Sequence, residues 1–221
     1  MTNEIPTMIV PTLNGQERLQ DLFASIDYPI GEVIIINNDY AEPVNVASDY
    51  VDWVHVLNMP DNLGVAASWN LGIKASPRNK YWLIVNDDVT FALGSLRKFA
   101  EHIEAHGTIS LCSDVSPWSA FAIGEDIVWA VGLFDEAFYP AYFEDTDYAR
   151  RARAIMGEDV IYYTDIPVYH ATSSTINNGY ASENKRTYRK NYETYENKKL
   201  NNNFGEIGWS LNVRRENDWG V

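Results

Sequence analysis

Short apolar runs alternate with longer amphipathic segments along the first half of the chain. The runs predict strands, and the segments between them predict helices, at residues 8–10, 17–26, 32–36, 51–57, 65–75 and 81–85. The runs at 33–36 and 82–85 are continuously apolar, as expected for central strands that are covered on both faces. Strands that alternate with helices are typical of an α/β fold, so we expect a mostly parallel sheet flanked by helices.

The second half of the chain begins with the same alternation and then changes. Its patterns predict further helices and strands at residues 93–106, 109–112, 119–123, 126–131 and 145–156, followed by a strand-like run at 160–163. From residue 172 the chain is rich in Asn, Tyr, Ser and Lys and poor in aliphatic residues. We therefore expect one domain over residues 1–171 and a polar C-terminal appendage over residues 172–221.

The appendage contains one helical pattern. Tyr188, Tyr192 and Tyr195 follow the i, i+4 and i+7 spacing of one helix face, and the asparagines at 201–203 end the pattern. The simplest interpretation is a helix that packs its tyrosines on the body. Alternatively, the tail binds an acceptor molecule or joins copies of the chain into a homo-oligomer.

Charge is divided unevenly between the body and the tail. The 221 residues carry a formal charge of −14, and 46% of them are hydrophobic, which is enough for one sizeable core. The tail holds 8 basic and 6 acidic residues, which leaves 9 basic and 25 acidic residues in the body. A body this acidic disfavours nonspecific binding of nucleic acid or anionic lipid. A site for an anionic nucleotide would need a local cation, which points to a metal ion.

The single cysteine, Cys112, excludes an internal disulfide and lies in an apolar stretch that predicts a buried strand. The first seven residues lack the basic and apolar regions of a signal peptide, and no run reaches the roughly 20 apolar residues of a membrane span. We therefore expect a cytoplasmic protein that does not span a membrane.

Polar segments follow each of the four strands predicted in the first half. They occupy positions 11–14, 37–39, 58–62 and 86–88. In an open α/β sheet, ligands bind outside the carboxyl ends of the strands. We therefore expect these four segments to form one polar cleft.

The tripeptide Asn86-Asp87-Asp88 places two carboxylates at the end of a very apolar strand. A cation would relieve their repulsion, and Mg²⁺ commonly takes one or two carboxylates together with substrate phosphates. The alternative is a solvated turn that caps the next helix.

Gly64 stands at the start of another predicted helix. The free N–H groups at this helix start can bind a diphosphate. The alternative is an ordinary turn that caps a packed helix.

A second acidic pair, Glu144-Asp145, lies among aromatic residues at the start of a predicted helix. One of these carboxylates can act as a general base where the aromatic residues partly shield it from water. Acidic residues at a helix start are also ordinary helix caps. Asp147 and Arg151 stand four residues apart and are expected to pair with each other. His170 follows the last strand-like run, and its imidazole is either structural or a ligand for an ion such as Mn²⁺.

Taken in order, these segments resemble family two of the inverting glycosyltransferases, which have the GT-A fold, and especially its rhamnosyltransferase-like and galactofuranosyltransferase-like members. The resemblance covers residues 8–170. It runs through Val10-Pro11-Thr12-Leu13-Asn14, Asn37-Asn38, Asn62-x-Gly64-x-Ala66-x-x-x-Asn70-x-Gly72, Asn86-Asp87-Asp88, Gly132-x-Phe134-Asp135-Glu136, Glu144-Asp145-x-Asp147 and His170. It implies a GT-A-type, Rossmann-like sheet and metal-dependent, inverting transfer of a sugar from a nucleoside-diphosphate sugar to a hydroxyl acceptor.

The resemblance also implies roles for individual residues. Asp145 would remove the proton from the acceptor hydroxyl, while Asp88 and His170 would bind the divalent metal, Mn²⁺ or Mg²⁺. The residues that would lie along the donor are Pro11, Thr12, Leu13, Asn37, Gly64, Asn70, Asn86 and Asp87.

Aromatic side chains are the candidates for a wall on the acceptor side of the site. Trp118 and Phe143, with Trp129 as a further candidate, can stack on a sugar or a peptide, although core packing is the ordinary role of such residues. Glu144 would be their acidic neighbour. The acceptor itself stays open between a glycan, a protein and another hydroxyl compound.

Two other functions are compatible with the sequence. Asn86 and Asn37 stand where the family often has aspartate, which favours a non-catalytic module that binds a nucleotide sugar or a glycan. A sugar nucleotidyltransferase on a similar sheet is the third possibility, although no glycine-rich, basic loop is evident near the first strand. The donor base, whether uracil, thymine or guanine, stays open.

Overall fold

The computed structural model describes residues 4–39, 41, 43–170 and 181–201. None of the helices within these ranges combines the length and apolar character needed to cross a membrane.

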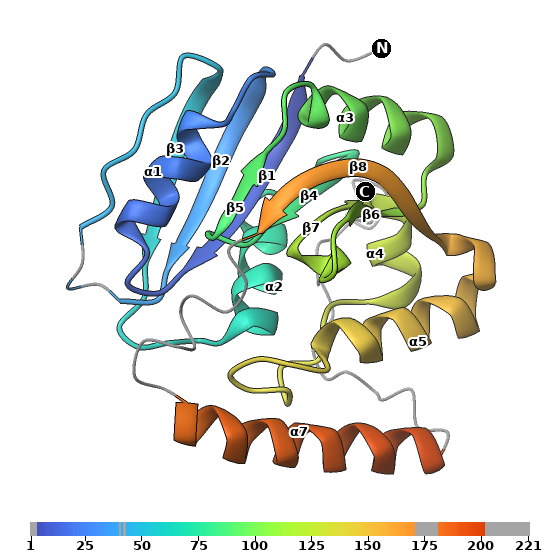
Figure 1. Ribbon diagram of the computed structural model, residues 1–221. Helices are drawn as coiled ribbons and strands as arrows, with labels where there is room; N and C mark the ends of the chain where they lie inside the picture. Colours follow the sequence, from blue (N-terminus) through green and yellow to red (C-terminus); the bar gives the residue numbers. More distant parts are fainter. Residues whose placement is uncertain (1–3, 40, 42, 171–180, 202–221) are drawn as a thin grey trace, which may run out of the picture.

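An eight-stranded sheet forms the centre of the described chain, in the order β3-β2-β1-β4-β7-β6-β8-β5 (Figure 1). β1 pairs in parallel with β2 and β4, and β2 pairs in parallel with β3. Beyond β4 the sheet is mixed, because β7 runs antiparallel to β4 and β6, β8 runs parallel to β6, and β5 runs antiparallel to β8. The strands are β1 (Ile5–Thr12), β2 (Ile30–Asn37), β3 (Val51–Asn58), β4 (Tyr81–Val85), β5 (Val89–Phe91), β6 (Ile109–Ser113), β7 (Ala120–Gly124) and β8 (Ile161–His170).

Helices cover both faces of this sheet. One face packs against α1 and α3, and the other packs against α2, α4 and α5. A further helix, α7, lies apart from the sheet, along the loop that leads into α5 (Figure 1). The helices are α1 (Gln16–Ala24), α2 (Val65–Ala75), α3 (Ser95–His106), α4 (Glu125–Val131), α5 (Glu144–Met156) and α7 (Ala181–Leu200), with short 3₁₀ turns at Pro117–Ser119 and Glu158–Val160.

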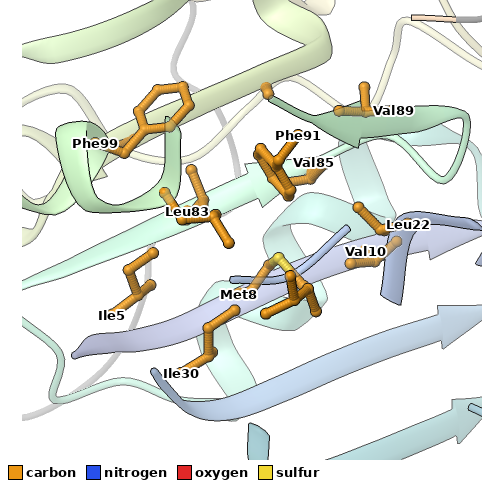
Figure 2. Packing of buried hydrophobic residues seen from close by; sticks show 14 of the residues in the cluster. Ile5, Met8, Val10, Leu22, Ile30, Leu83, Val85, Val89, Phe91 and Phe99 are labelled. Carbon is orange, nitrogen blue, oxygen red and sulfur yellow. The ribbon is translucent and has the colours of Figure 1, made fainter. Parts of the chain in front are cut away.

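Two hydrophobic cores lie on the two faces because successive residues of a strand point to opposite sides. Met8 of β1 and Leu83 of β4 belong to the core shown in Figure 2, under α1 and α3. Their neighbours Ile9 and Trp82 belong to the core under α2, α4 and α5. All four side chains are fully buried. The continuously apolar strands are therefore covered on both faces, as the sequence predicted.

The predicted α/β fold class is confirmed, but the outer part of the sheet differs from the expectation. β5 was not predicted, since its three residues directly follow two aspartates that favour a turn. β8 extends to His170 rather than ending near residue 163. Only alternate residues of its second half are buried, at Thr164, Ile166 and Val168, so this half lacks the continuous apolar run of the central strands.

The predicted tyrosine helix is present as α7. The division of the chain near residue 171 stays a prediction, because residues 171–180 and 202–221 lie outside the described part.

Close contact between α2 and β1 leads to a stability prediction at Gly72. A Cβ built there would overlap the side chain of Ile9, so the helix backbone packs directly on the strand. Alanine is ordinarily more favourable than glycine in a helix by about 0.5–1 kcal/mol. We expect Gly72→Ala instead to lower the free energy of unfolding by about 1–3 kcal/mol, measured by urea unfolding.

Gly124→Ala is the matched control, since the nearest atom to a Cβ at Gly124 is 3.9 Å away. It should change the free energy of unfolding by less than about 0.5 kcal/mol. A Gly72→Ala protein as stable as the wild type would show that α2 can move away from β1 at no cost.

Candidate active site

A cavity of about 840 Å³ lies at the carboxyl ends of β1 and β4. The parallel pairing of these strands brings the segments that follow them to the same edge of the sheet. The start of α2, the start of α5 and the end of β8 contribute the other walls. Most residues predicted for the site line this cavity, namely Pro11, Thr12, Leu13, Gly64, Asn86, Asp87, Asp88, Trp118, Glu144, Asp145 and His170.

Asp87 is held by a buried network of hydrogen bonds. Arg18 donates to both of its oxygens, from Nε at 3.1 Å and from Nη2 at 2.9 Å, and the Thr12 hydroxyl donates at 2.6 Å. Gly15 leaves room for this network, because a Cβ there would overlap both Asp87 and Thr12. Burial raises the pKa of the Asp87 carboxyl, while the bonds from Arg18 and Thr12 oppose that rise. Arg18 was not predicted; it lies on α1, outside the segments at the strand ends.

Asp88 and His170 face each other across the pairing of β5 with β8. Val89 stands opposite His170 in the register, which places Asp88 beside the imidazole. His170 Nε2 lies 3.1 Å from Asp88 Oδ1, and His170 Nδ1 lies 3.2 Å from Asp114 Oδ2. The hydrogen bond to Asp88 is the main cause that raises the pKa of His170, with burial opposing it and Asp114 adding to it. Asp114 was not predicted, although it follows β6 as a polar residue at a strand end.

The Asp88–His170 pair fits a divalent cation by the chemistry and spacing of its donor atoms. Neighbouring ligands of an octahedral ion with bonds of about 2.1 Å lie about 3 Å apart, close to the observed 3.1 Å. Metal-binding histidines commonly donate their other ring N–H to a carboxylate, and Asp114 occupies that position. Within the described ranges no cluster of three or more His, Cys, Asp or Glu could hold a metal ion, so this pair would supply only two ligands and a substrate would have to supply others.

The start of α2 is partly occupied by another loop. Gly64 has a φ of +80°, a conformation that favours glycine, and the N–H of Val65 donates to Pro140 O at 2.7 Å. The first free N–H of this helix is therefore already engaged. A role for Gly64 beside a diphosphate stays a prediction.

Glu144 and Asp145 begin α5 in different environments. Glu144 is 6% exposed, and its Oε2 has no hydrogen-bond partner within the described structure. Burial, together with the neighbouring charge of Asp145, raises the pKa of Glu144 to about 8. Asp145 is half-buried and accepts hydrogen bonds from the Thr146 N–H and hydroxyl, and burial raises its pKa as well. Glu144 therefore keeps its proton near neutral pH, and Asp145 is the accessible carboxylate of the pair.

The loop before α5 has a costly backbone conformation. Tyr142 and Phe143 have φ angles of +77° and +75°. Left-handed conformations cost non-glycine residues about 1–2 kcal/mol each, so surrounding contacts must hold them. Beyond this loop, the expected pairing of Asp147 with Arg151 is confirmed at 2.8 Å.

Three predicted site residues lie outside the cavity lining. Asn37 donates to Asn58 Oδ1 at 2.9 Å. Asn70 bonds the backbone of Phe134 through both its amide nitrogen and its amide oxygen. Phe143 packs against tyrosines of α7. Trp129, the further aromatic candidate, donates to Glu125 and also lies outside the lining.

Asn38 and Asp39 line the cavity beside the position expected for Asn37. Asn38 accepts a hydrogen bond from the N–H of Leu63 and donates one to the hydroxyl of Ser68, so it connects the end of β2 to α2 and to the loop before it. Asn37, the last residue of β2, is instead bonded to Asn58 at the end of β3, and the cavity receives the two residues that follow the strand.

A family-level comparison matches residues 7–156 to the family described as Glycosyl transferase family 2. A search of curated proteins gave no match.

Solved structures with the same fold include three proteins of low sequence identity. S. aureus TarS is 15% identical, with a TM-score of 0.57 over 76% of this chain and 37% of that chain. Mannosyltransferase PcManGT from Pyrobaculum calidifontis, in complex with GDP-Man and Mn²⁺, is 15% identical, with a TM-score of 0.52 over 73% of this chain and 56% of that one. The chain thus spans well under two thirds of the length of either.

Glucosyl-3-phosphoglycerate synthase from Mycobacterium tuberculosis, in complex with Mn²⁺, UDP and phosphoglyceric acid, is 11% identical. Its TM-score is 0.60 over 86% of this chain and 77% of that chain. At these identities the three structures show the fold that the chain shares with them.

Glu144→Gln should remove a pH dependence of stability. An unfolded glutamate titrates near pH 4.3, whereas Glu144 in the folded protein titrates near 8. Between these values the folded protein holds one more proton than the unfolded chain. The free energy of unfolding therefore falls as pH rises, by up to about 1.4 kcal/mol per pH unit from this group. Urea unfolding between pH 5 and 8 should show a steeper decline for the wild type than for Glu144→Gln.

The exposed Glu101 provides the control, since Glu101→Gln should keep the wild-type slope. Equal slopes in the wild type and Glu144→Gln would contradict a raised pKa at Glu144.

Proposed function

The chain belongs to glycosyl transferase family 2, and on that premise we propose that it transfers a sugar from a nucleoside-diphosphate sugar to an acceptor hydroxyl. The observation that carries the proposal is one cavity lined both by the Asp88–His170 pair and by the accessible carboxylate of Asp145. Such a transfer needs positive charge at the departing diphosphate and a base at the attacking hydroxyl.

We propose that the reaction depends on Mn²⁺ or Mg²⁺ held by Asp88 and His170. The described lining contains six carboxylate side chains and neither lysine nor arginine. A diphosphate bound there would therefore need a cation that the lining does not supply. A divalent ion would neutralise the charge that develops on the leaving nucleoside diphosphate. The Mn²⁺ complexes of PcManGT and glucosyl-3-phosphoglycerate synthase support the dependence on a divalent metal.

The donor would lie along the ends of β1 and β4. Pro11, Thr12 and Leu13, which line the cavity, would contact the nucleoside, and Asp87, which accepts a hydrogen bond from Thr12, would lie beside them. Asn86 would also contact the donor, because it lines the same cavity at the end of β4. Asn38, which lines the cavity at the end of β2, is a further candidate for donor contact.

We propose Asp145 as the base that removes the proton from the acceptor hydroxyl. A single base, with attack opposite the leaving group, gives inversion at the anomeric carbon. Glu144, protonated beside it, would donate a hydrogen bond to a substrate oxygen, and Trp118 would offer an aromatic surface to the acceptor. The rhamnosyltransferase-like or galactofuranosyltransferase-like subtype stays a prediction, as does a cytoplasmic location.

A non-catalytic binding module is the second candidate, favoured by Asn86 in place of an aspartate at the end of β4. Such a module would bind a nucleotide sugar without turning it over. Turnover is therefore the measurement that separates the two candidates.

We expect the full chain to hydrolyse or transfer sugar from at least one donor in a panel of UDP, dTDP and GDP sugars with Mn²⁺ or Mg²⁺. Asp145→Asn should lower kcat by about 100-fold or more, because a general base typically contributes that much, while binding of the donor persists. Asp126→Asn, at an exposed position on α4, is the control and should keep wild-type activity. Binding without turnover by the wild type would favour the non-catalytic module, and full activity of Asp145→Asn would refute the assignment of the base.

His170→Ala should weaken nucleotide binding only when metal is present. We expect the Kd for the preferred nucleoside diphosphate, measured by calorimetry in Mn²⁺, to rise about tenfold or more. In EDTA the variant and the wild type should bind equally. His106→Ala, at an exposed position of α3, should match the wild type in both buffers. A metal-dependent affinity that survives His170→Ala would remove His170 from the metal site.

A further inference from the structure

Helix α7 lies outside the residues matched by the family, yet it borders the cavity. The family match ends at residue 156, whereas α7 spans Ala181–Leu200. Figure 1 shows this helix alongside the loop that leads into α5. Thr187 of α7 is among the residues that line the cavity. The helix therefore supplies part of the wall on the side of Asp145.

Asn191 connects α7 directly to that loop. The residue is 0% exposed, and its amide nitrogen lies within hydrogen-bonding distance of three carbonyl oxygens, those of Ala141 at 2.9 Å, Tyr139 at 3.2 Å and Tyr142 at 3.4 Å. Its own Oδ1 is buried without a hydrogen-bond partner within the described chain, which is unfavourable. Within the described chain, this side chain therefore makes its hydrogen bonds through the two N–H donors of its amide nitrogen.

Aromatic and charged contacts fix the same segment from both sides of Asn191. The ring of Phe143 lies 5.1 Å from Tyr188 and 5.7 Å from Tyr195, measured between centroids. One helical turn further along, Lys198 Nζ lies 2.6 Å from Asp135 and 2.8 Å from Asp147. α7 thus holds the chain both before and after the Glu144-Asp145 pair.

We propose that α7 completes the acceptor side of the active site and that Asn191 is a positioning residue, which holds residues 139–143 so that Asp145 faces the cavity. Tyr142 and Phe143 keep left-handed backbone conformations only while surrounding contacts hold them. The Asn191 amide binds the carbonyls on this stretch, and Asp145 follows two residues later. The catalytic part of the proposal rests on the proposed transferase function, whereas the clamping of the loop does not.

Asn191→Asp tests the clamp with almost no change in shape, because it replaces the N–H donors by carboxylate oxygens. Hydrogen–deuterium exchange of the full chain should show residues 139–147 exchanging about tenfold or more faster than in the wild type. Asn197→Asp makes the same substitution on an exposed face of α7 and should leave that exchange unchanged. Unchanged protection of 139–147 in a folded Asn191→Asp protein would overturn the proposal.

Kinetics on the preferred donor from the panel test the catalytic part. Asn191→Asp should lower kcat for donor hydrolysis about 10- to 100-fold, since small misplacement of a catalytic group has effects of this size, while the Kd for the nucleoside diphosphate changes less than twofold. A variant that loses nucleotide affinity in proportion to activity would indicate a general structural defect and overturn the positioning role.

Tyr188→Ala provides a second variant in case Asn191→Asp fails to fold. Tyr188 is 48% exposed, so its removal should be tolerated, and it contacts both Tyr142 and Phe143. The same direction of change in exchange and in kcat is expected, and no change in either would overturn the proposal. Faster exchange of 139–147 in a protein whose wild type turns over no donor would uphold the clamp and count against the transferase function alone.

Discussion

Two adjacent carboxylates at the end of the buried strand β4 are the constraint from which the site follows. Asp87 and Asp88 leave an apolar strand together, and a protein interior holds such charges only when each is compensated. Arg18 forms an ion pair with Asp87, and the imidazole of His170 lies 3.1 Å from Asp88. Because Arg18 comes from the first helix and His170 from the last strand, these two pairs bring opposite ends of the body to one cavity.

The other carboxylates of the cavity are arranged differently. Glu144 keeps its proton because burial leaves it no compensating charge, and Asp145 stays accessible beside it. In the proposed function, one wall would hold a cation and another would offer a base, which is the division of roles that sugar transfer from a diphosphate requires. The second wall depends on α7, whose Asn191 binds the loop before this pair, so the family-matched segment alone lacks a contact that shapes it.

Features that leave a local trace could be predicted from the sequence. Alternating apolar runs indicated the α/β sheet, and the polar residues that follow such runs indicated a cleft that includes Asp87 and Asp88. The place of Asp145 in the same site was implied by the resemblance to the family. Asn37 shows the limit of this reasoning, since the next two residues, Asn38 and Asp39, line the cavity while Asn37 does not. Asn37 is bonded to Asn58 of the neighbouring strand, a contact that the sequence pattern does not show.

By itself the sequence determined the class of fold and marked Asp87, Asp88 and His170 as polar residues that follow apolar, strand-like runs. Only the tertiary structure decided which side chains form hydrogen bonds and ion pairs with these residues. Arg18 reaches Asp87 across 69 positions, and Asp114 reaches His170 across 56. Asn191 contacts its loop across about 50 positions. Contacts between residues this far apart follow from strand register and helix packing, and they leave no periodic signal along the chain.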